Sequence, residues 1–478
     1  MHHLNRFKNQ VKSDTELFRL AIDNAPMKNN IYQTYTFFLL HNEGQKDKEF
    51  IVKCWETLIS RLHKGKESDL LNLYIHFPFC KSPCDYCVYP STTFKGEKQV
   101  NDYLDFLSRE VDTYSELFKD LTFKNLSIGG GTPNMMTVEQ LDWLLNKIFS
   151  NFSFDKKKKK GIEFNPSTVT PGHFKTIEKY GFNRVSFGVQ SLSESVLEKI
   201  NRSYQNSKKI TNAIKDLKST NISFLNLDML MGLFGDTKKD FLYSFEELCK
   251  LQPDSLSIYP IKTNEHYIKA RYNSFDEFQE YYYNLFDEVI PKLPAIAKKY
   301  GYSIPYSSKD EVSYVHPVTF MRKDFEFRYS YANFSTEPYS NLGLGFYAQS
   351  CINNLIRYQM IDRNHPDCLF LKSFSTDEKD FTYTTMRFAR RYSRVKFIVH
   401  ETFKKFSVDR EKYKKRFGKD IIEEFPYACK ALHHLNKIKI TDDKIAWNVK
   451  DERETYVPLL FFSGRDNVKK ALKMLNVI

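Results

Sequence analysis

Short apolar runs alternate with amphipathic stretches through the middle of the 478-residue chain. The apolar runs have the length of strands, and stretches such as VNDYLDFLSREVDTYSELF and VEQLDWLLNKIF between them have helical periodicity. Strands are predicted at residues 71–77, 125–131, 161–166, 183–190, 224–232 and 255–261. These six strand-then-helix units predict an α/β protein with a parallel sheet, either an open sheet or a partial barrel.

The sequence on either side of these units follows other patterns. Residues 1–70 are polar and mostly helical in pattern, with the clearest amphipathic helix at 50–62. After the last strand come a long helical pattern at 276–300 and then irregular, aromatic-rich sequence; near the end, 425–448 predicts a helix followed by a short hairpin. The expected organisation is an N-terminal helical extension (1–70), a core (71–262), a bridging, substrate-proximal region (263–395) and a mainly helical C-terminal domain (396–478).

Composition narrows the class of protein only slightly. The chain has 72 Lys and Arg against 59 Asp and Glu, and its net charge of +13 suits an anionic partner. The run Lys156–Lys160 lies between a helix and a strand and is predicted to be a solvated turn, so charge alone does not indicate nucleic acid. Because no apolar run has transmembrane length, the start has no apolar signal-peptide stretch and the eight cysteines are few, we expect a cytoplasmic protein in a reducing compartment.

Three of the cysteines crowd together directly after the first predicted strand, in LYIHFPFCKSPCDYCVYP. The spacing of Cys80, Cys84 and Cys87 makes three unrelated buried thiols a poor explanation. A structural zinc site normally has four ligands, usually from two C-x2-C pairs, and the sequence offers no second pair. An iron–sulfur cubane held by three thiolates leaves one iron open. The missing fourth cysteine is a defect for zinc, but it suits a cluster that must bind and reduce another molecule.

Unusual residues also mark the ends of the later strands. The second strand ends in Gly129–Thr132, the third carries Glu163, the fourth ends in Gln190 and the fifth carries Asp228. Polar residues in buried strands are costly unless they are paired, and the carboxyl ends of barrel strands are where active sites form. Taken together, these residues predict a site at one edge of the sheet.

The cysteine spacing C-x3-C-x2-C, with an aromatic residue before the last cysteine, resembles the cluster motif of radical S-adenosylmethionine (radical SAM) enzymes. Together with GGGTPN, IEFNP, GFNRVSFGVQSL, INRSY and LNLDMLMGLFGDT, it is similar to the oxygen-independent coproporphyrinogen III dehydrogenase (coproporphyrinogen oxidase-like) family over about residues 71–262. The resemblance implies a partial (βα)6 TIM-type barrel followed by a winged-helix-like C-terminal domain.

The resemblance also implies cofactors and their ligands. Cys80, Cys84 and Cys87 would hold a [4Fe–4S] cluster whose open iron binds SAM, and reductive cleavage of SAM would give a 5′-deoxyadenosyl radical. The stretch Leu342–Gly345 would border the substrate and any second SAM molecule. The residues that would line SAM are Tyr74, Tyr86, Gly129, Gly130, Gly131, Thr132, Glu163, Gln190, Arg202 and Asp228. Among these, Glu163 and Asp228 suit hydroxyl groups, and the planar fork of Arg202 suits a carboxylate.

Two departures from the family pattern bear on the reaction. The family's oxidative decarboxylation of coproporphyrinogen III goes with an extra cysteine just after the motif, where this chain has Val88 and Tyr89, and the family's upstream arginine stretch is not evident. By elimination, the sequence favours radical methyl or one-carbon transfer to a tetrapyrrole or heteroaromatic substrate. The alternatives are coproporphyrinogen III oxidation and a heme-binding chaperone with a non-catalytic cluster. The expected partners are the small-molecule substrate and an electron donor such as flavodoxin or ferredoxin.

Overall fold

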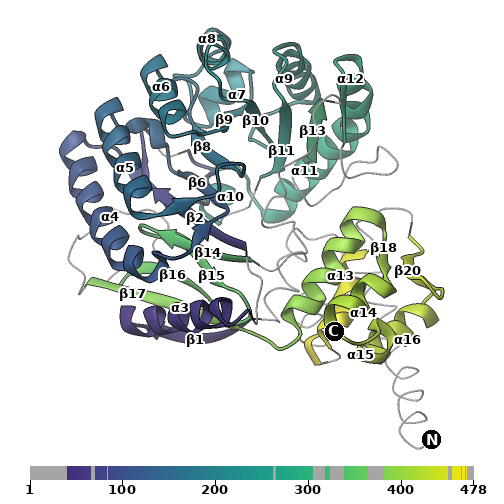
Figure 1. The fold of residues 1–478 in the computed structure, drawn as a ribbon. Coiled ribbons are helices and arrows are strands. Elements are labelled where there is room, and N and C mark those ends of the chain that lie inside the picture. The colour runs from purple at the N-terminus through teal and green to yellow at the C-terminus, as the bar shows by residue number, and fades with distance from the viewer. Residues whose placement is uncertain are drawn as a thin grey trace, which may run out of the picture.

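One large sheet organises the computed structural model (Figure 1). The structure describes residues 40–65, 70–82, 84–261, 265–304, 318–322, 339–363, 380–449, 455–464, 466–468 and 470. All six predicted strands are present and pair in parallel, in chain order: β2 (Leu70–Phe77), β6 (Asn125–Gly130), β8 (Lys160–Phe164), β9 (Arg184–Gln190), β10 (Phe224–Met231) and β11 (Ser255–Pro260). The predicted α/β class with a parallel sheet is therefore confirmed.

The sheet continues beyond these six strands on both sides. A seventh parallel strand, β14 (Tyr339–Leu344), pairs with β2, so Leu342–Gly345 lies beside the first strand of the core. Antiparallel strands complete the two edges: β13 (Val318–Arg322) and β12 (Tyr302–Ser303) beside β11, and β15 (Gln349–Ile352), β16 (Ile356–Asp362), β17 (Phe381–Phe388) and β1 (Leu40–Lys46) beyond β14. The expectation of irregular sequence after the long helix is wrong at these strands.

The first 70 residues depart in part from the helical expectation. Helix α3 (Lys48–His63) contains the predicted amphipathic helix, and Asp47 caps its first turn by accepting a hydrogen bond from the backbone N–H of Phe50. Strand β1 precedes it and pairs with β17, more than 330 residues further along the chain. Because β1 gains its partner only in the folded sheet, local pattern could not reveal it. Residues 1–39 of the predicted extension lie outside the described ranges.

Helices cover the outer face of the curved sheet in one row (Figure 1). Their N-termini follow ordinary capping rules: Thr137 and Gln140 form a reciprocal capping box at the start of α5. The helix predicted at 276–300 is present but divided, because Pro291 and Pro294 lack an N–H donor. The row and its continuation comprise α4 (Glu97–Phe118), α5 (Val138–Asn151), α6 (Pro171–Lys179), α7 (Glu194–Lys199), α8 (Ser207–Lys218), α9 (Lys238–Lys250), α10 (Glu265–Arg271), α11 (Phe275–Val289) and α12 (Leu293–Lys299).

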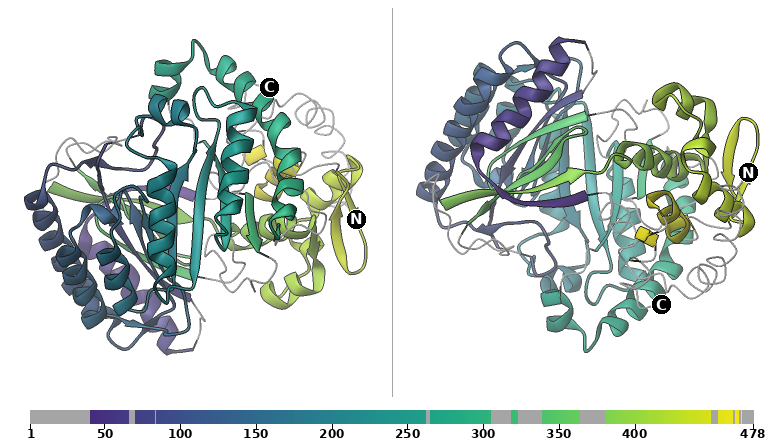
Figure 2. Two further views of the ribbon diagram at one scale, coloured as in Figure 1. Left: turned by 90° about the horizontal axis from the view of Figure 1, so that it is seen from above. Right: turned by 90° about the horizontal axis from the view of Figure 1, so that it is seen from below.

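The C-terminal module lies to one side of the sheet and apart from the row of helices (Figure 2). It has its own apolar core, and the predicted helix and hairpin at 425–448 are confirmed. Its three-stranded sheet has the order β18–β20–β19. Its elements are α13 (Tyr392–Lys405), β18 (Ser407–Asp409), α14 (Arg410–Phe417), α15 (Ile421–Glu424), α16 (Pro426–His434), β19 (Ile438–Ile440), β20 (Lys444–Trp447) and α17 (Tyr456–Leu459).

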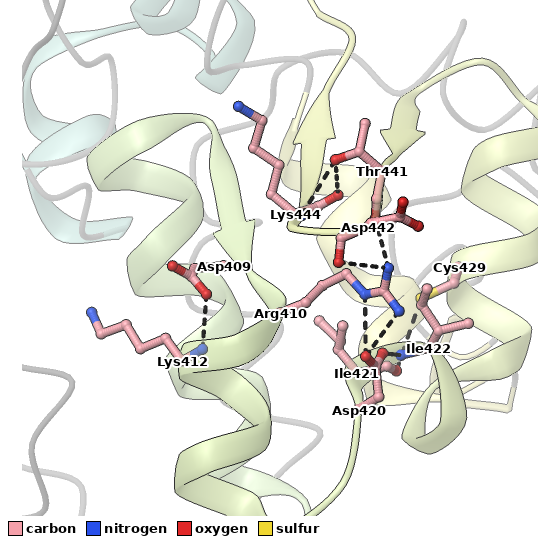
Figure 3. A network of polar contacts seen from close by, with 10 residues as sticks. All are labelled: Asp409, Arg410, Lys412, Asp420, Ile421, Ile422, Cys429, Thr441, Asp442 and Lys444. Carbon is pink, nitrogen blue, oxygen red and sulfur yellow. Dashed lines mark hydrogen bonds and ion pairs between the residues drawn. The ribbon is translucent and has the colours of Figure 1, made fainter.

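Arg410 links three parts of this module (Figure 3). Its guanidinium donates to the carboxylate of Asp420 through Nε at 3.2 Å and a terminal nitrogen at 2.9 Å. The other terminal nitrogen donates to the backbone oxygens of Thr441, at 2.6 Å, and Asp442, at 3.1 Å. The start of α14, the start of α15 and the β19–β20 turn are therefore held by one side chain.

Arg410→Ala is expected to lower the free energy of unfolding of the C-terminal module by about 2 kcal/mol, because charge-assisted hydrogen bonds in a mostly buried position are lost. Urea unfolding of the full chain, followed by the fluorescence of Trp447 in this module, measures the effect. Lys415→Ala, an exposed position on the same helix, is the matched control. Equal unfolding midpoints for the two variants would contradict the linking role.

Candidate active site

The three cysteines lie on a closed loop at the carboxyl end of β2. The loop begins at β3 (Phe79–Cys80), which pairs with β4 (Thr92–Thr93), and the backbone N–H of Phe94 donates to the oxygen of Cys80 at 2.8 Å. Within the loop, the N–H of Cys87 donates to the oxygen of Cys84 at 2.9 Å. The first contact closes the loop at its two ends, and the second places Cys84 and Cys87 in the same turn.

The three sulfur atoms are free thiols, and burial disfavours the bare thiolate at Cys80 and Cys87. Burial raises the pKa of Cys80, an effect partly offset by Thr132, whose hydroxyl donates to the Cys80 sulfur at 3.6 Å. Burial also raises the pKa of Cys87 to about 12. A bound metal replaces the thiol proton, so such sulfurs become thiolates when they coordinate iron.

Among the described residues, no group of three or more His, Cys, Asp or Glu side chains is arranged to hold one metal ion. The three cysteines of a cubane each bind a different iron, so their sulfurs need not converge on one point. The donor set fits such a cluster because it has soft sulfur ligands, three on one loop.

The glycine run at the end of β6 is required by packing inside the protein. A Cβ on Gly129 would lie 2.8 Å from a carboxylate oxygen of Glu163, and a Cβ on Gly130 would lie 2.5 Å from the ring of His76. Gly130 also has a φ of +109°, which side-chain-bearing residues rarely adopt. In the structure, Gly129 makes room for Glu163 and Gly130 makes room for His76, and their expected place beside SAM stays a prediction.

His76 is a site residue that the sequence analysis missed. Its Nε2 lies 2.9 Å from the backbone oxygen of Pro90, which only accepts, so Nε2 carries the proton and Nδ1 accepts from the Tyr74 hydroxyl at 3.1 Å. Burial lowers the pKa of His76 to about 4, so the ring is neutral near neutral pH. His76 therefore fixes the direction of the Tyr74 hydroxyl proton. A histidine on a buried strand was the only signal available in the sequence.

Glu163 and Asp228 lie on neighbouring parts of the inner sheet face. Burial raises the pKa of Glu163 to about 7, and repulsion from Asp228 adds to the shift, although the Glu163 side chain stays open to solvent. Burial also raises the pKa of Asp228, and two hydrogen bonds oppose this: Ser186 and Asn226 each donate to its carboxylate at 2.7 Å. The carboxyl group of Asp228 is therefore close enough to raise the pKa of Glu163. The sequence analysis expected the two residues to lie near each other because both follow strands that end at the same edge of the sheet.

Two cationic side chains, Lys159 and Arg184, lie close enough to Glu163 to affect its pKa. Lys159 and Arg184 both favour the ionised form of Glu163, and the side chains of both lie against Gly161. Burial, followed by repulsion from Arg184, lowers the pKa of Lys159 to about 7. The prediction of a solvated turn at Lys156–Lys160 holds for the first three lysines, which are exposed, and is wrong for Lys159 and Lys160, which turn inward.

Arg202 is a buried cation beside the cysteine loop. One terminal nitrogen donates to the backbone oxygen of Gly188 at 3.1 Å, and the other lies 3.4 Å from the hydroxyl of Tyr86. Its Nε is buried and has no hydrogen-bond partner among the described residues. Nearby, Gln190 ends β9 with a φ of +70°, opposite a bulge in the pairing with β10. The unused Nε is a donor suited to a ligand carboxylate.

Asn134 and Asn165, from the motifs GGGTPN and IEFNP, hold two loops of the site together. The Asn165 backbone N–H donates to the Asn134 side chain at 2.9 Å, and the Asn134 side chain donates back to the Asn165 oxygen at 3.0 Å. The Asn165 side chain donates to the Tyr204 hydroxyl at 3.1 Å. These residues were quoted with the motifs but given no role, and the structure makes them the contact between the loops after β6 and β8.

The structure brings the candidate residues to one end of the parallel sheet. Its contacts link Cys80 to Thr132, Gly129 to Glu163, and Tyr86 to Arg202. The folded protein therefore has a polar site beside a three-cysteine loop, with a buried arginine and with two carboxyl groups on the inner sheet face. This combination is typical of one class of protein.

Comparison with known proteins identifies that class. Residues 74–248 match the Radical SAM superfamily, so the chain contains a radical SAM domain. This range includes the cysteine loop and Glu163, Gln190, Arg202 and Asp228.

Curated proteins that match the chain include ones named heme chaperone HemW and ones named oxygen-independent coproporphyrinogen III oxidase. The chain is 31% identical over 191 residues to the heme chaperone HemW of Buchnera aphidicola subsp. Schizaphis graminum (40% of this chain, 50% of that protein). It is 29% identical over 189 residues to the oxygen-independent coproporphyrinogen III oxidase of Salmonella typhimurium (40% and 41%). The chain thus spans about half the length of the curated relatives it matches. The resemblance inferred from the motifs is confirmed.

The fold similarity extends further than the sequence similarity. The solved structure of coproporphyrinogen III oxidase (HemN) from Escherichia coli superposes with a TM-score of 0.69 at 20% identity, covering 86% of this chain and 92% of that one. The expected radical SAM fold with a helical C-terminal part is therefore confirmed. The preference for methyl transfer finds no support in these relatives. No helix in the described ranges is long and apolar enough to cross a membrane.

Proposed function

We propose that this chain is a radical SAM enzyme that removes hydrogen from a side chain of a tetrapyrrole, as in coproporphyrinogen III oxidation. The observation that carries the proposal is the juxtaposition of the three-cysteine loop with a buried arginine that has a free donor and with two carboxyl groups. The relatives named for coproporphyrinogen III oxidase support the substrate class.

Each residue of the site has a part in this chemistry. Cys80, Cys84 and Cys87 would hold a [4Fe–4S] cluster, and the bound cluster would supply the electron that cleaves SAM to a 5′-deoxyadenosyl radical. The guanidinium of Arg202 would pair with the carboxylate of SAM. The ionised carboxylates of Glu163 and Asp228 would accept hydrogen bonds from the ribose hydroxyls, because only the ionised form accepts with both oxygens.

The raised pKa of Glu163 makes its proposed contact with SAM depend on pH. Its carboxyl group has a pKa of about 7, so raising the pH through this value ionises it and improves its ability to accept hydrogen bonds. We expect the affinity for SAM to rise severalfold between pH 6 and pH 8, with a slope of at most about tenfold per pH unit. Calorimetric titration of the cluster-loaded protein with SAM measures this, and Glu163→Gln should flatten the profile. A profile that is equally steep in the variant would assign the titration to another group.

The test of the proposed function is a product assay with three substrate conditions. Anaerobically reconstituted protein is incubated with SAM and dithionite, together with coproporphyrinogen III, heme or no addition. The proposal expects 5′-deoxyadenosine, with more product and loss of carbon dioxide in the presence of coproporphyrinogen III. Formation of S-adenosylhomocysteine with substrate would instead indicate methyl transfer. No 5′-deoxyadenosine under any condition would overturn the proposal.

A heme chaperone is the second candidate. It is favoured by the similarity to HemW and by Val88 and Tyr89, which stand where the oxidase pattern has the extra cysteine. A chaperone would bind heme in a fixed ratio and would leave coproporphyrinogen III unchanged. Heme titration followed by absorption, run beside the product assay, separates the two candidates.

A further inference from the structure

Two short backbone segments hold hydroxyl-bearing side chains beside Cys80. The first is the end of the glycine run, where the backbone N–H of Thr132 donates to the oxygen of Phe79 at 2.8 Å. The second is β4, which pairs with the short strand that contains Cys80 and is directly preceded by Ser91. Both contacts are made by the main chain, so the positions of Thr132 and Ser91 do not depend on their own side chains.

The two hydroxyl groups act on the sulfur of Cys80. Thr132 donates from its hydroxyl to this sulfur at 3.6 Å. Ser91 is 1% exposed, and none of the described residues outside the cysteine loop takes up its hydroxyl in a hydrogen bond. Burial raises the pKa of Cys80, and the hydroxyls of Thr132 and Ser91 both oppose this shift. We call the two groups the hydroxyl pair.

The sulfur of Cys87 has different surroundings. It lies 3.8 Å from the backbone oxygen of Tyr89, which can accept a hydrogen bond but cannot donate one. Cys80 and Cys87 thus belong to one loop, but two side-chain donors from outside that loop converge on Cys80. This difference needs a reason beyond holding iron, because a thiolate can bind iron without a hydroxyl beside it.

Hydrogen bonds to the sulfur ligands are one of the features that set the reduction potential of an iron–sulfur cluster. Reduction adds one electron and therefore one negative charge, and it makes or breaks no bond to Cys80. A hydroxyl hydrogen that points at the thiolate stabilises the more negative state more than the less negative one. The effect is stronger in a buried site, where the effective dielectric constant is low.

We propose that the hydroxyl pair of Thr132 and Ser91 donates to the Cys80 sulfur and thereby raises the reduction potential of the cluster held by the cysteine loop. This inference rests on the proposed function, because a reduction potential at Cys80 has meaning only with a cluster on the loop. It makes Thr132 and Ser91 positioning residues that act on the cluster through Cys80. It also gives Thr132 a part to play besides its expected place beside SAM.

The test measures the reduction potential of the cluster-loaded chain without SAM and without substrate, so that a contact between Thr132 and SAM cannot contribute. Dithionite supplies the electrons in a redox titration followed by electron paramagnetic resonance, and iron content verifies the cluster. The double variant Thr132→Val, Ser91→Ala is expected to lower the equilibrium constant for reduction about tenfold, which is about 59 mV for one electron. Each single variant should show part of this shift in the same direction.

Two control variants identify the hydroxyl as the cause. Thr132→Ser keeps the hydroxyl and should keep the natural potential. Thr93→Val removes an exposed hydroxyl from β4, two residues after Ser91, and should also keep the natural potential. An equal shift in Thr93→Val would overturn the proposal, because any change in this segment would then alter the potential.

The remaining outcomes separate this proposal from the proposed function. Natural potentials in both Thr132→Val and Ser91→Ala, or potentials above the natural one, would overturn the role of the hydroxyl pair and leave the proposed function intact. If Thr132→Val loses its cluster, Ser91→Ala still decides, because it removes a donor to the same sulfur from another segment. A natural chain that takes up no iron–sulfur cluster would instead overturn the proposed function, and iron content shows which of the two has failed.

Discussion

Cys84→Ala is expected to abolish both cluster binding and SAM cleavage. The cysteine loop offers three sulfur ligands, and the removal of one leaves an iron of the cubane without its protein ligand. Anaerobic reconstitution should leave the variant without iron–sulfur absorption, and 5′-deoxyadenosine should fall to background, a loss on the order of a thousandfold or more if chemistry depends wholly on the cluster. Iron content and the product assay measure the two effects.

Cys54→Ala is the matched control for this experiment. Cys54 is a free, half-buried cysteine like Cys84, but it lies on α3 outside the cysteine loop. Its replacement should leave iron content and product unchanged. Full cluster retention in Cys84→Ala would refute the assignment of the loop, and equal loss in both variants would indicate a general effect on folding.

Arg202→Ala is expected to weaken SAM binding by at least about thirtyfold. A buried guanidinium that pairs with a ligand carboxylate contributes about 2–5 kcal/mol when measured by truncation. The side chain is 5% exposed, and its Nε has no partner among the described residues, so the variant removes a donor that the protein itself does not use. Calorimetric titration of the cluster-loaded variant with SAM measures the loss.

Two further measurements identify the cause of that loss. Arg202→Lys keeps the positive charge but not the planar fork, so its affinity should fall between those of the natural chain and the alanine variant. The arginine also donates to Gly188 and lies near Tyr86, so its loss could disturb the fold. Circular dichroism and iron content that stay close to those of the natural chain would show that the fold is kept. SAM affinity within threefold of the natural value in Arg202→Ala would contradict the proposed pairing.

The strands of the core could be predicted from sequence because each is a short segment rich in apolar residues between helical patterns, as expected for a parallel sheet covered by helices. Strands β14 to β17 and β1 were not predicted, because polar residues interrupt their apolar positions and because β14 and β1 pair with strands far away in the chain. Their stability comes from the edge of the existing sheet, and a local pattern holds no record of that edge.

The residues of the candidate site also fall into two groups, those that the sequence indicated and those that only the structure showed. Residues with unusual chemistry in a strand, such as Glu163 and Asp228, stand out by type alone. His76 and Lys159 do not, because their importance comes from neighbours: His76 from the Tyr74 hydroxyl and Pro90, and Lys159 from Arg184 and Glu163. The five-lysine run shows the limit most clearly, since identical residues at 156–158 and 159–160 have opposite surroundings.

The sequence by itself determined the parallel α/β core, the three-cysteine loop and the class of protein, because these depend on periodicity and on residue types at fixed spacing. Only the tertiary structure decided which protein atoms occupy the space beside the glycines, which tautomer His76 adopts, how far Asp228 shifts the pKa of Glu163 and which hydroxyl donates to the sulfur of Cys80. The reason is physical: packing, desolvation and Coulomb interactions depend on distances between residues that are remote in the chain, and those distances exist only once the sheet has formed.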